Sequence, residues 1–383
     1  MQAKLLRERG LDVIFFAADK LENEDLTAAG VRHVNAGASP LMKSHPIKAA
    51  TRGMYNAAVR DRLADLVSEV DTPQTVYHVH SWSKTLTTSV FAALRPVFNR
   101  TFVHAHDFFL ACPNGGFMDY QAMKPCDRKP LGFDCLSTNC DKRSYAQKLW
   151  RVGRQNVLRR VLPSSSPLAG VFMIHPEMAR YLKKAGFGDQ QLITLRNPAT
   201  AFSDTRVHAE ANNRFIFVGR VEAEKGVEEL VLSAKRTGVA LTVVGDGPLR
   251  ENLAKAYPEV QFTGWKDRSE IQGLIGSARA LVMPSRYPEP FGLVVVEAAL
   301  SGVPIILSET AFLSQEVESA GLGYACNTGD PDQFDNILRR MQSATKDTVK
   351  DMSERGFGGE DALCTTPDDW VAQQIKHYGA VIT

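Results

Sequence analysis

Short runs of β-branched and aromatic residues alternate with helical patterns along this chain, and that alternation constrains its fold more than any other feature. Such alternation is typical of βαβ units, which build parallel sheets with helices on both faces. The chain has 383 residues, too many for one ordinary domain and enough for two. We therefore predict an α/β protein with two doubly wound domains that face a cleft. Strands are expected at Asp12–Ala17, Val76–His80, Thr101–His104, Gly170–Ile174, Leu192–Leu195, Arg214–Val218, Ala240–Val244, Gln261–Phe262, Ala280–Met283 and Pro304–Leu307.

The expected domain boundaries follow from where these strands stop and polar residues take over. We predict a first domain at residues 1–200 and a second at residues 201–365, with the polar stretch before Asn213 as their linker. A last helix within residues 366–383 follows a Thr-Thr-Pro stop and is expected to pack back on the first domain.

The start of the chain departs from the usual pattern. A doubly wound domain ordinarily begins with its central strand and a glycine-rich turn. This chain begins on a helix, with Leu5, Leu6 and Leu11 on the side expected to be buried. We therefore expect the first domain to lack its first strand, which leaves two neighbouring strands without partners. Either the true N-terminus lies upstream or this domain is compromised.

The near-neutral total charge hides an asymmetry. Residues 1–200 hold 27 Lys and Arg against 17 Asp and Glu, a formal charge of +10, whereas the remainder holds 18 against 26, a formal charge of −8. The segment from Lys142 to Pro176 has no acidic residue and interleaves its cations with aromatic and aliphatic side chains. Such a helix fits the surface of an anionic membrane, and it equally fits a solvated basic helix beside acidic neighbours. Because no nucleic-acid-binding motif accompanies the charge, nucleic acid is not an expected partner.

The sequence also bears on location. No apolar run reaches the roughly 18 residues that a membrane-spanning helix needs, and the first residues have no signal-peptide core. We therefore expect a cytoplasmic protein, peripheral at the inner membrane face, with its six cysteines reduced. Four of them, Cys112, Cys126, Cys135 and Cys140, cluster in sequence without a C-x₂-C knuckle, so buried free thiols and a structural zinc site both stay open.

The segment from Pro284 to Ala298 carries the most specific pattern in the chain. A strand ends before it, a proline-rich turn follows, and a helix opens near Gly292. Phosphate suits a helix N-terminus, where N–H groups and the macrodipole favour negative charge. Glu289 and Glu297 lie eight residues apart, one before the helix and one inside it. That spacing suits two carboxylates on separate hydroxyl-bearing parts of one ligand.

A second strand, ending at Val218, leads into Gly219 and then Arg220 and Lys225. Both cations leave the carboxyl end of a strand, where open α/β sheets bind ligands, and they match a diphosphate. Further strands end near Gly245 and at Gly264–Trp265, so four loops are expected to share one crevice. Taken singly, Arg220 would be a surface cation and Glu289 a helix cap.

Together these residues resemble glycosyltransferase family 4, which has the GT-B fold of two Rossmann-like domains. The resemblance is most specific between Phe215 and Ala325. It implies retaining transfer of a sugar from a nucleotide-diphosphate donor, with Arg220 and Lys225 on the diphosphate. It also implies that Glu289 binds hydroxyls of the transferred sugar and that Glu297 takes the ribose. Further substrate contacts are implied at Gly219, Gly264, Trp265, Phe291, Gly292, Leu293 and Val294.

In the first domain the resemblance points to the segment His106-Asp107. It implies that His106 contacts the donor sugar and supports catalysis, while Asp107 orients it or contacts the acceptor. His80 is a weaker candidate for lining the cleft. No residue of this sequence corresponds to the family's glycine-rich loop, because that loop would follow the strand that is expected to be missing.

The expected mechanism needs no cofactor and no divalent metal. Asp330-Pro331-Asp332 formally matches a metal-binding Asp-x-Asp, but it precedes a helix and is predicted to be a turn and N-cap. We expect same-face attack by an acceptor hydroxyl, with the departing diphosphate as base and its charge stabilised by cations. A lipid-linked or glycan acceptor in polysaccharide assembly fits the basic first domain. The alternatives are a non-catalytic or truncated nucleotide-sugar-binding GT-B protein and a GT-B phosphorylase or epimerase. A dinucleotide-dependent oxidoreductase is excluded, since no strand precedes a G-x-G-x-x-G motif.

Overall fold

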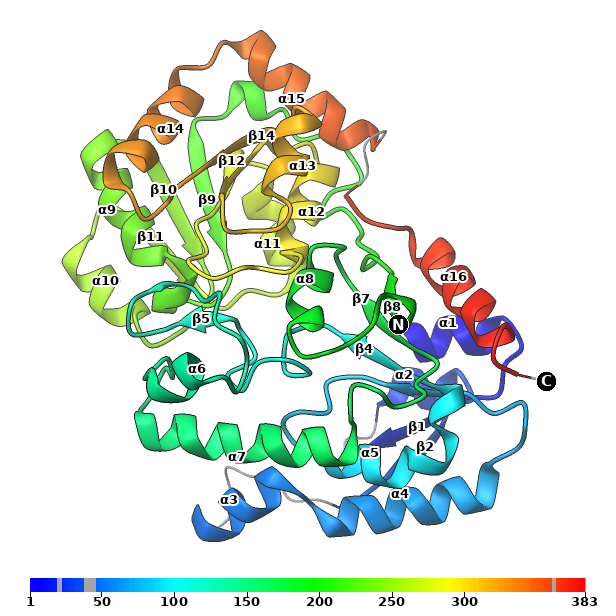
Figure 1. Cartoon of the computed structure of the whole chain (residues 1–383). Helices are drawn as coiled ribbons and strands as arrows, with labels where there is room; N and C mark the ends of the chain where they lie inside the picture. The colour runs from blue at the N-terminus through cyan, green and yellow to red at the C-terminus, as the bar shows by residue number, and fades with distance from the viewer. Residues whose placement is uncertain (19–22, 38–45, 360–362, 383) are drawn as a thin grey trace. The chain divides into compact units, whose positions relative to one another are not determined.

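The computed structural model describes residues 1–18, 23–37, 46–359 and 363–382 (Figure 1). These residues form two compact units. The first unit combines Met1–Phe117, Asp127–Arg196 and Pro367–Thr383, and the second combines Met118–Cys126 and Asn197–Thr366. The grouping of 118–126 with the second unit has no counterpart in the sequence-based boundaries at 200 and 365.

The second unit is built on one parallel sheet with the strand order β11-β10-β9-β12-β13-β14. Its strands are β9 (Arg214–Val218), β10 (Ala240–Val244), β11 (Gln261–Gly264), β12 (Ala278–Met283), β13 (Ile305–Ser308) and β14 (Gly323–Cys326). Counted along this unit, the order is 3-2-1-4-5-6, the arrangement of a Rossmann-type sheet. Every strand of this sheet expected from the sequence is present, with ends shifted by at most two residues, whereas β14 was missed, as were β2 (Arg32–Asn35), β5 (Met118–Asp119) and β6 (Lys124–Pro125) outside this sheet.

Helices cover both faces of this sheet (Figure 1). They are α9 (Val227–Thr237), α10 (Arg250–Ala256), α11 (Arg268–Ile275), α12 (Leu293–Leu300), α13 (Ser314–Ser319), α14 (Pro331–Ser343) and α15 (Lys346–Gly358). Right-handed crossovers that run outward in both directions from β9 and β12 place α9 and α12 on opposite faces. The core beneath α9 and α14 is apolar, and Phe215, Leu230 and Leu338 are fully buried in it.

The strands of the first unit do not form one continuous sheet. Four of them make a parallel sheet in the order β3-β4-β7-β8, and two make a separate parallel pair, β1-β2. They are β1 (Ile14–Ala17), β2 (Arg32–Asn35), β3 (Tyr77–Val79), β4 (Thr101–Ala105), β7 (Gly170–Met173) and β8 (Leu192–Thr194). A short antiparallel pair, β5 (Met118–Asp119) and β6 (Lys124–Pro125), belongs to the second unit.

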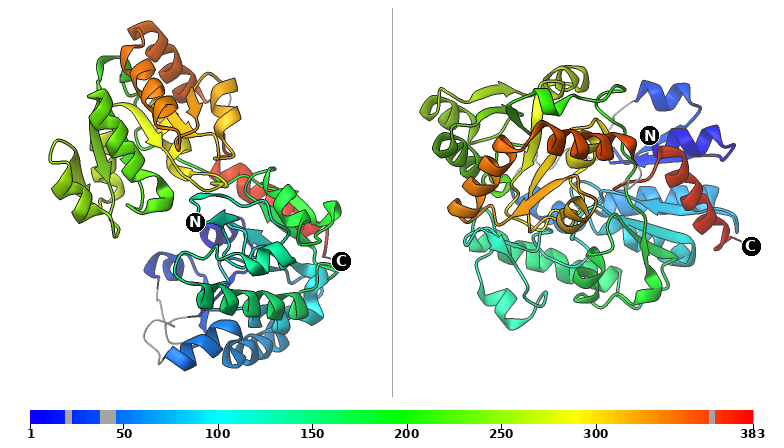
Figure 2. Two further views of the ribbon diagram at one scale, coloured as in Figure 1. Left: turned by 60° about the vertical axis from the view of Figure 1, so that its left-hand side comes forward. Right: turned by 90° about the horizontal axis from the view of Figure 1, so that it is seen from above.

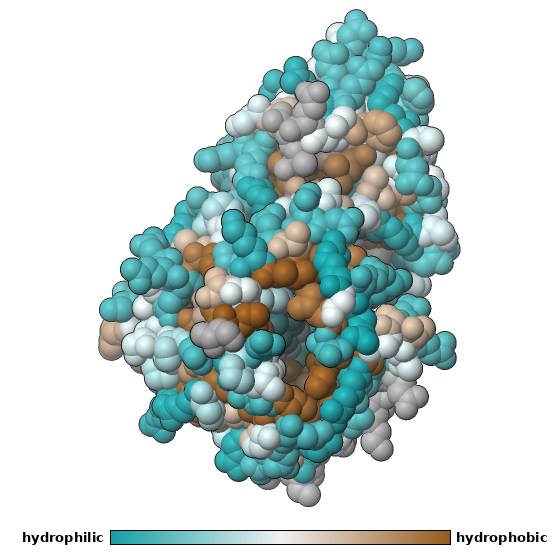
Figure 3. Space-filling model, turned by 90° about the vertical axis from the view of Figure 1, so that its right-hand side faces the viewer, coloured by the Kyte–Doolittle hydropathy of each residue, from teal (hydrophilic) through white to brown (hydrophobic). Residues whose placement is uncertain are grey.

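The split lies where the sequence predicts a missing first strand. Among the described strands, β1 pairs with β2 alone and β3 pairs with β4 alone. Ile14 and Phe15 on β1 remain exposed, although apolar strand residues are normally covered. Figure 3 shows hydrophobic side chains around a hollow in the first unit. The sheet is therefore interrupted between β1 and β3.

The helices of the first unit surround these strands (Figure 2). They are α1 (Gln2–Glu8), α2 (Glu24–Ala28), α3 (Pro46–Met54), α4 (Ala57–Val70), α5 (Ser89–Leu94), α6 (Phe133–Ser137), α7 (Tyr145–Val161), α8 (Met178–Lys183) and α16 (Pro367–Gly379). The last helix packs with the first unit, where α16 lies beside α1. The expectation of a buried side on α1 is met only in part. Leu6 packs against the core that contains Trp370 and Tyr378, but Leu5 and Leu6 are only half-buried and no residue of that helix is buried. In the part of the chain that the structure describes, every helix is too short or too polar to cross a membrane.

The basic helix α7 differs in part from both readings of its sequence. Lys148 and Arg154 are buried, and neither a solvated face nor a membrane-facing stripe includes them. The Lys148 ammonium donates to the carbonyl oxygen of Cys135 at 2.7 Å and contacts the Cys140 sulfur at 2.9 Å. Arg154 lies 4.7 Å above the Phe109 ring, and burial lowers its pKa to about 10. Part of the basic charge thus holds the first unit together instead of facing solvent.

Candidate functional site

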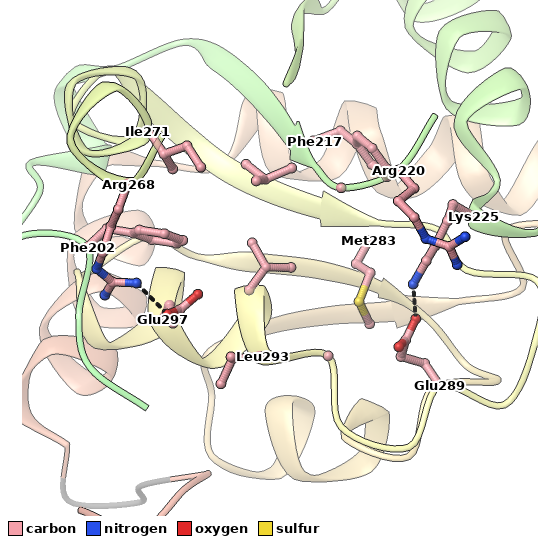
Figure 4. Close-up of a pocket in the computed structure, with 14 residues that line it drawn as sticks. Phe202, Phe217, Arg220, Lys225, Arg268, Ile271, Met283, Glu289, Leu293 and Glu297 are labelled. Atoms are coloured by element: carbon pink, nitrogen blue, oxygen red, sulfur yellow. Dashed lines mark hydrogen bonds and ion pairs between the residues drawn. The ribbon is translucent and has the colours of Figure 1, made fainter. Parts of the chain in front are cut away.

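The strand order of the second unit reverses between β9 and β12, so the loops after these strands diverge and leave a crevice at their carboxyl ends. A pocket of about 460 Å³ lies there, and all of its lining comes from the second unit. The lining residues are Phe202, Phe217, Val218, Gly219, Arg220, Lys225, Arg268, Ile271, Met283, Glu289, Gly292, Leu293, Val294 and Glu297. Polar groups gather at its two ends, with Met283 and Leu293 between them (Figure 4).

Two glycines bring the backbone close to this pocket. Gly226 has φ +69°, and a Cβ there would lie 2.1 Å from the carbonyl oxygen of Pro284. Only glycine therefore lets the loop after β9 lie against the loop after β12. Gly292 has φ +68° and precedes the first residue of α12, which places a helix N-terminus with its partial positive charge at the pocket wall.

One end of the pocket holds an ion pair that joins the two loops (Figure 4). The Lys225 ammonium lies 2.6 Å from a carboxylate oxygen of Glu289 and donates to the Tyr287 hydroxyl at 3.0 Å. The Ser285 hydroxyl donates to the same oxygen of Glu289 at 3.1 Å. The Glu289 side chain is only 12% exposed, so this carboxylate depends on its partners for its charge.

The electrostatics of this end follow from burial and charge together. Burial alone would raise the pKa of Glu289, but the Lys225 charge and the bonds from Tyr287 and Ser285 outweigh it, so the pKa lies below its usual value. Burial and the neighbouring Glu289 carboxylate raise the pKa of the Tyr287 hydroxyl. At neutral pH this end therefore presents an ionised carboxylate and a neutral phenol beside Lys225.

Arg220 stands beside this ion pair on the open side of the pocket. Its guanidinium pairs with Glu222 at 2.5 Å, and its side chain is 63% exposed. The two basic side chains therefore differ, because Lys225 is held by a partly buried carboxylate and Arg220 remains accessible to a ligand. Anionic groups of a ligand would meet both cations and the N-terminus of α12.

The other end of the pocket is organised by Arg268, the first residue of α11. Its guanidinium pairs with Glu297 at 2.6 Å, donates to the Thr200 carbonyl at 2.8 Å and lies 5.1 Å from the centre of the Phe202 ring. Glu297, which was expected to bind a ribose, thus already forms an ion pair with Arg268 (Figure 4). An aromatic ring, a cation and a carboxylate lie together at this end.

The site residues predicted from the sequence did not include six of the lining residues, which are Phe202, Phe217, Val218, Arg268, Ile271 and Met283. Arg268 directly follows Asp267, which caps α11 after β11, so its place at a strand's carboxyl end was available as a signal. Phe202 and Ile271 carry no comparable local signal. Among the substrate contacts expected in the second unit, three do not line the pocket: Gly264 and Phe291 are buried, and Trp265 is 73% exposed.

His106 and Asp107 belong to the first unit, just beyond the end of β4. His106 contacts His80 through ring nitrogens 3.1 Å apart, and burial lowers its pKa, so its imidazole is neutral at pH 7. Asp107 accepts a hydrogen bond from the Phe109 backbone N–H at 3.0 Å, and burial raises its pKa. That bond fixes the turn after β4.

The cysteines of the first unit gather around a lysine. Asn114 accepts from the Cys112 thiol at 3.1 Å, while Lys148 contacts Cys140. Within the described residues, the group whose ligand atoms lie close enough for a metal ion consists of three histidines and includes no cysteine. The structural zinc site that the sequence left open at Cys112, Cys126, Cys135 and Cys140 is therefore not supported by this geometry, and Cys112, Cys135 and Cys140 are buried thiols.

Asp330 has the role predicted for it. Its carboxylate accepts hydrogen bonds from the backbone N–H groups of Asp332 and Gln333 at 3.0 and 3.2 Å, which caps α14. Its charge is thus committed to the helix N-terminus.

Comparison with known proteins fits this architecture. Residues 200–357 match the sequence profile of glycosyl transferases group 1. That segment belongs to this glycosyltransferase family. The chain is 34% identical over 126 residues to glycogen synthase from Mycobacterium tuberculosis, covering 30% of each chain. It is 39% identical over 167 residues to a GDP-mannose-dependent alpha-mannosyltransferase from Mycolicibacterium smegmatis, covering 43% of each. The chain therefore spans only 30–43% of the length of these curated relatives.

The similarity of fold extends further than the similarity of sequence. Sucrose-phosphate synthase from Thermosynechococcus elongatus matches with a TM-score of 0.72 and 19% identity, over 99% of this chain and 91% of that one. The predicted GT-B fold is confirmed, and so is the resemblance to glycosyltransferase family 4. The pocket lies inside the segment that carries the glycosyltransferase profile.

The ion pair between Lys225 and Glu289 makes a direct prediction about pKa. In Lys225→Met the buried carboxylate keeps its desolvation and loses its main counter-charge, so the pKa of Glu289 rises above the ordinary 4.5. In the wild-type protein the ion pair contributes its full stability at pH values above the ordinary glutamate pKa of 4.5. That contribution is lost only as the pH falls through the lowered pKa of Glu289. A ¹³C-carboxyl NMR titration measures the pKa of Glu289 in the wild type and in Lys225→Met. The Glu289→Gln spectrum assigns the signal.

Lys266→Met is the matched control, since it removes the same charge from an exposed pair with Glu270. It should leave the pKa of Glu289 unchanged. If Lys225→Met also leaves that pKa in place, the ion pair does not govern this end of the pocket.

Proposed function

We propose that this protein is a retaining glycosyltransferase that moves a hexose from a nucleoside diphosphate sugar to an acceptor hydroxyl. The observation that carries the proposal is the pocket itself, which joins a cationic end to an aromatic and carboxylate end at the switch point of a Rossmann-type sheet. The family of residues 200–357 supports the same activity.

The two ends fit two parts of such a donor. Arg220, Lys225 and the N-terminus of α12 would receive the diphosphate. Phe202, Arg268 and Glu297 would receive the nucleoside, with the Glu297 carboxylate on ribose hydroxyls. Glu289 would then contact hydroxyls of the transferred sugar.

Charge development explains why these residues suit transfer. When the glycosidic bond to the diphosphate breaks, negative charge grows on the leaving phosphate. Arg220 and Lys225 stabilise that charge without needing to reorganise, because the protein already holds Lys225 in place. The acceptor hydroxyl would attack from the face that the phosphate leaves and give its proton to that phosphate, so the anomeric configuration is retained. No metal takes part in this mechanism.

The first unit contributes in this proposal through His106, whose neutral imidazole can donate or accept a hydrogen bond to the sugar. GDP-mannose is the first donor to test, because the name of the Mycolicibacterium smegmatis relative specifies it.

The acceptor that we propose is a lipid-linked sugar or glycan at a membrane surface. Exposed apolar side chains support this: Phe133 on α6 is 84% exposed, and Tyr145 and Leu149 face outward on α7. Exposed cations flank them, Lys142 and Arg143 before α7 and Arg159 and Arg160 at its end. Apolar anchors ringed by cations suit peripheral binding to anionic lipid.

Vesicle sedimentation tests this surface. Wild-type protein should bind vesicles that contain anionic lipid more tightly than neutral ones, and Phe133→Ser with Leu149→Ser should weaken that binding several-fold. Ile382→Ser, which removes an apolar side chain that is also exposed, should change little. Equal binding by all variants would refute the surface.

Arg220→Ala tests the donor site. Loss of its charge-assisted bonds to a diphosphate should weaken GDP binding about 10- to 100-fold, since each such bond contributes about 1.5–3 kcal/mol. Titration calorimetry with GDP, UDP and ADP measures the affinity and selects the base. Lys350→Ala on α15 removes an equally exposed cation far along the chain from the pocket and should bind as the wild type does.

Glu289→Gln separates transfer from binding. It should keep GDP affinity within about threefold, because the diphosphate contacts remain. Release of GDP from GDP-mannose in the presence of acceptor should fall at least tenfold. Nucleotide binding without any turnover in the wild type would favour the non-catalytic alternative, and phosphate-dependent turnover without acceptor would favour a phosphorylase.

A further inference from the structure

Three histidines stack on one face of the first unit's sheet. His78 and His80 are two residues apart around β3, so their side chains share a face, and His104 lies on the neighbouring strand β4. The ring centres of His78 and His80 are 4.2 Å apart, and those of His80 and His104 are 4.9 Å apart. One nitrogen from each ring lies within 4.8 Å of the others.

These rings contain buried nitrogens that lack partners. In the described residues, Nε2 of His78, Nε2 of His80 and both ring nitrogens of His104 are buried without a hydrogen bond. His104 as a whole is 2% exposed. A buried polar atom without a partner costs about 1–3 kcal/mol, so four of them in one cluster require an explanation such as a bound ion or water.

The opposite nitrogens of two rings are held. Nδ1 of His78 contacts the Tyr378 hydroxyl and the Gln2 amide, the latter at 2.9 Å. Nδ1 of His80 contacts His106 at 3.1 Å. A histidine that binds a metal through one nitrogen is normally oriented by a hydrogen bond at the other. His78 and His80 both show that pattern, with Nε2 left for a ligand.

We propose that His78, His80 and His104 bind a transition-metal ion, with Zn²⁺ as the first candidate. A set of imidazoles alone selects Zn²⁺, Cu²⁺, Ni²⁺ or Co²⁺ over the hard cations Mg²⁺ and Ca²⁺. Zinc–nitrogen bonds of about 2.0–2.1 Å bring ligand nitrogens to about 3.4 Å apart in a tetrahedron. The rings are stacked, with the planes of His78 and His104 only 6° apart, so metal binding requires them to turn about χ2 until their nitrogens converge.

The surroundings indicate a structural role for this ion. α1 and α16 cover the cluster, because Gln2 and Tyr378 contact His78 and the Trp370 ring lies 6.0 Å from that of His104. The metal would therefore fasten both helices to the sheet. The three histidines belong to the first unit and the lining of the proposed donor pocket belongs to the second, but His80 also contacts His106, the residue proposed to contact the donor sugar.

The test uses the full chain without a histidine tag. The protein is stripped with chelator, incubated with Zn²⁺, dialysed and analysed for metal by mass spectrometry. We expect one equivalent in the wild type. His80→Phe and His104→Phe keep the ring packing and should weaken Zn²⁺ binding at least about 100-fold, while Tyr378→Phe should weaken it about tenfold by releasing the orientation of His78. Circular dichroism checks that each variant folds.

Two controls separate the cluster from other sources of binding. His208→Phe alters an exposed histidine of the second unit and should retain the metal. A double variant, Cys112→Ser with Cys140→Ser, should retain it as well. Loss of zinc in the cysteine variant alone, or unchanged binding in His104→Phe, would overturn the proposal.

X-ray absorption of the zinc-loaded wild type needs no variant at all. Nitrogen neighbours at about 2.0 Å would support the histidines, whereas sulfur neighbours at about 2.3 Å would assign the metal to cysteine. A wild type that retains no zinc would show that the orphaned nitrogens bind water instead.

Discussion

The ion pair between Lys225 and Glu289 joins the loop that leaves β9 to the loop that leaves β12, and it orders the cationic end of the pocket. Removing one partner from such a pair leaves a buried charge uncompensated, at a cost of about 3–5 kcal/mol. Gly226 allows the same two loops to touch, since any side chain there would collide with Pro284. Charge and steric fit therefore fix the position of the two loops relative to each other, and the Lys225 ammonium lies beside the exposed Arg220.

Much of this site could be predicted from the sequence, because its residues follow strands. Arg220, Lys225 and Glu289 each come shortly after a run of apolar β-branched residues, and carboxyl ends of parallel strands meet at one edge. Phe202 and Arg268 could not be found in that way. Phe202 comes from the linker, and its place in the pocket depends on Arg268, which holds the linker carbonyls. Such a contact depends on tertiary packing, which no local pattern records.

The features of the first unit were predicted less well from the sequence. Two neighbouring strands without partners were predicted from the sequence, and among the described strands β1 and β3 lie at the edges of separate sheets. The charge pattern of α7 was misleading, because composition does not reveal that Lys148 points inward at carbonyl oxygens and a thiol. The histidine cluster was equally hidden. His78 and His104 are 26 residues apart and become neighbours only through the pairing of β3 with β4.

We propose that the switch point of the second unit binds a nucleoside diphosphate sugar. Hydrogen exchange of the full chain, with and without GDP-mannose, locates the bound ligand, and GDP and UDP-glucose serve as parallel ligands. We expect slower exchange in the backbone amides of residues 219–226 and 285–294, the two loops that Lys225 and Glu289 join. Unchanged exchange in both loops with every nucleotide, or protection confined to the first unit, would contradict it.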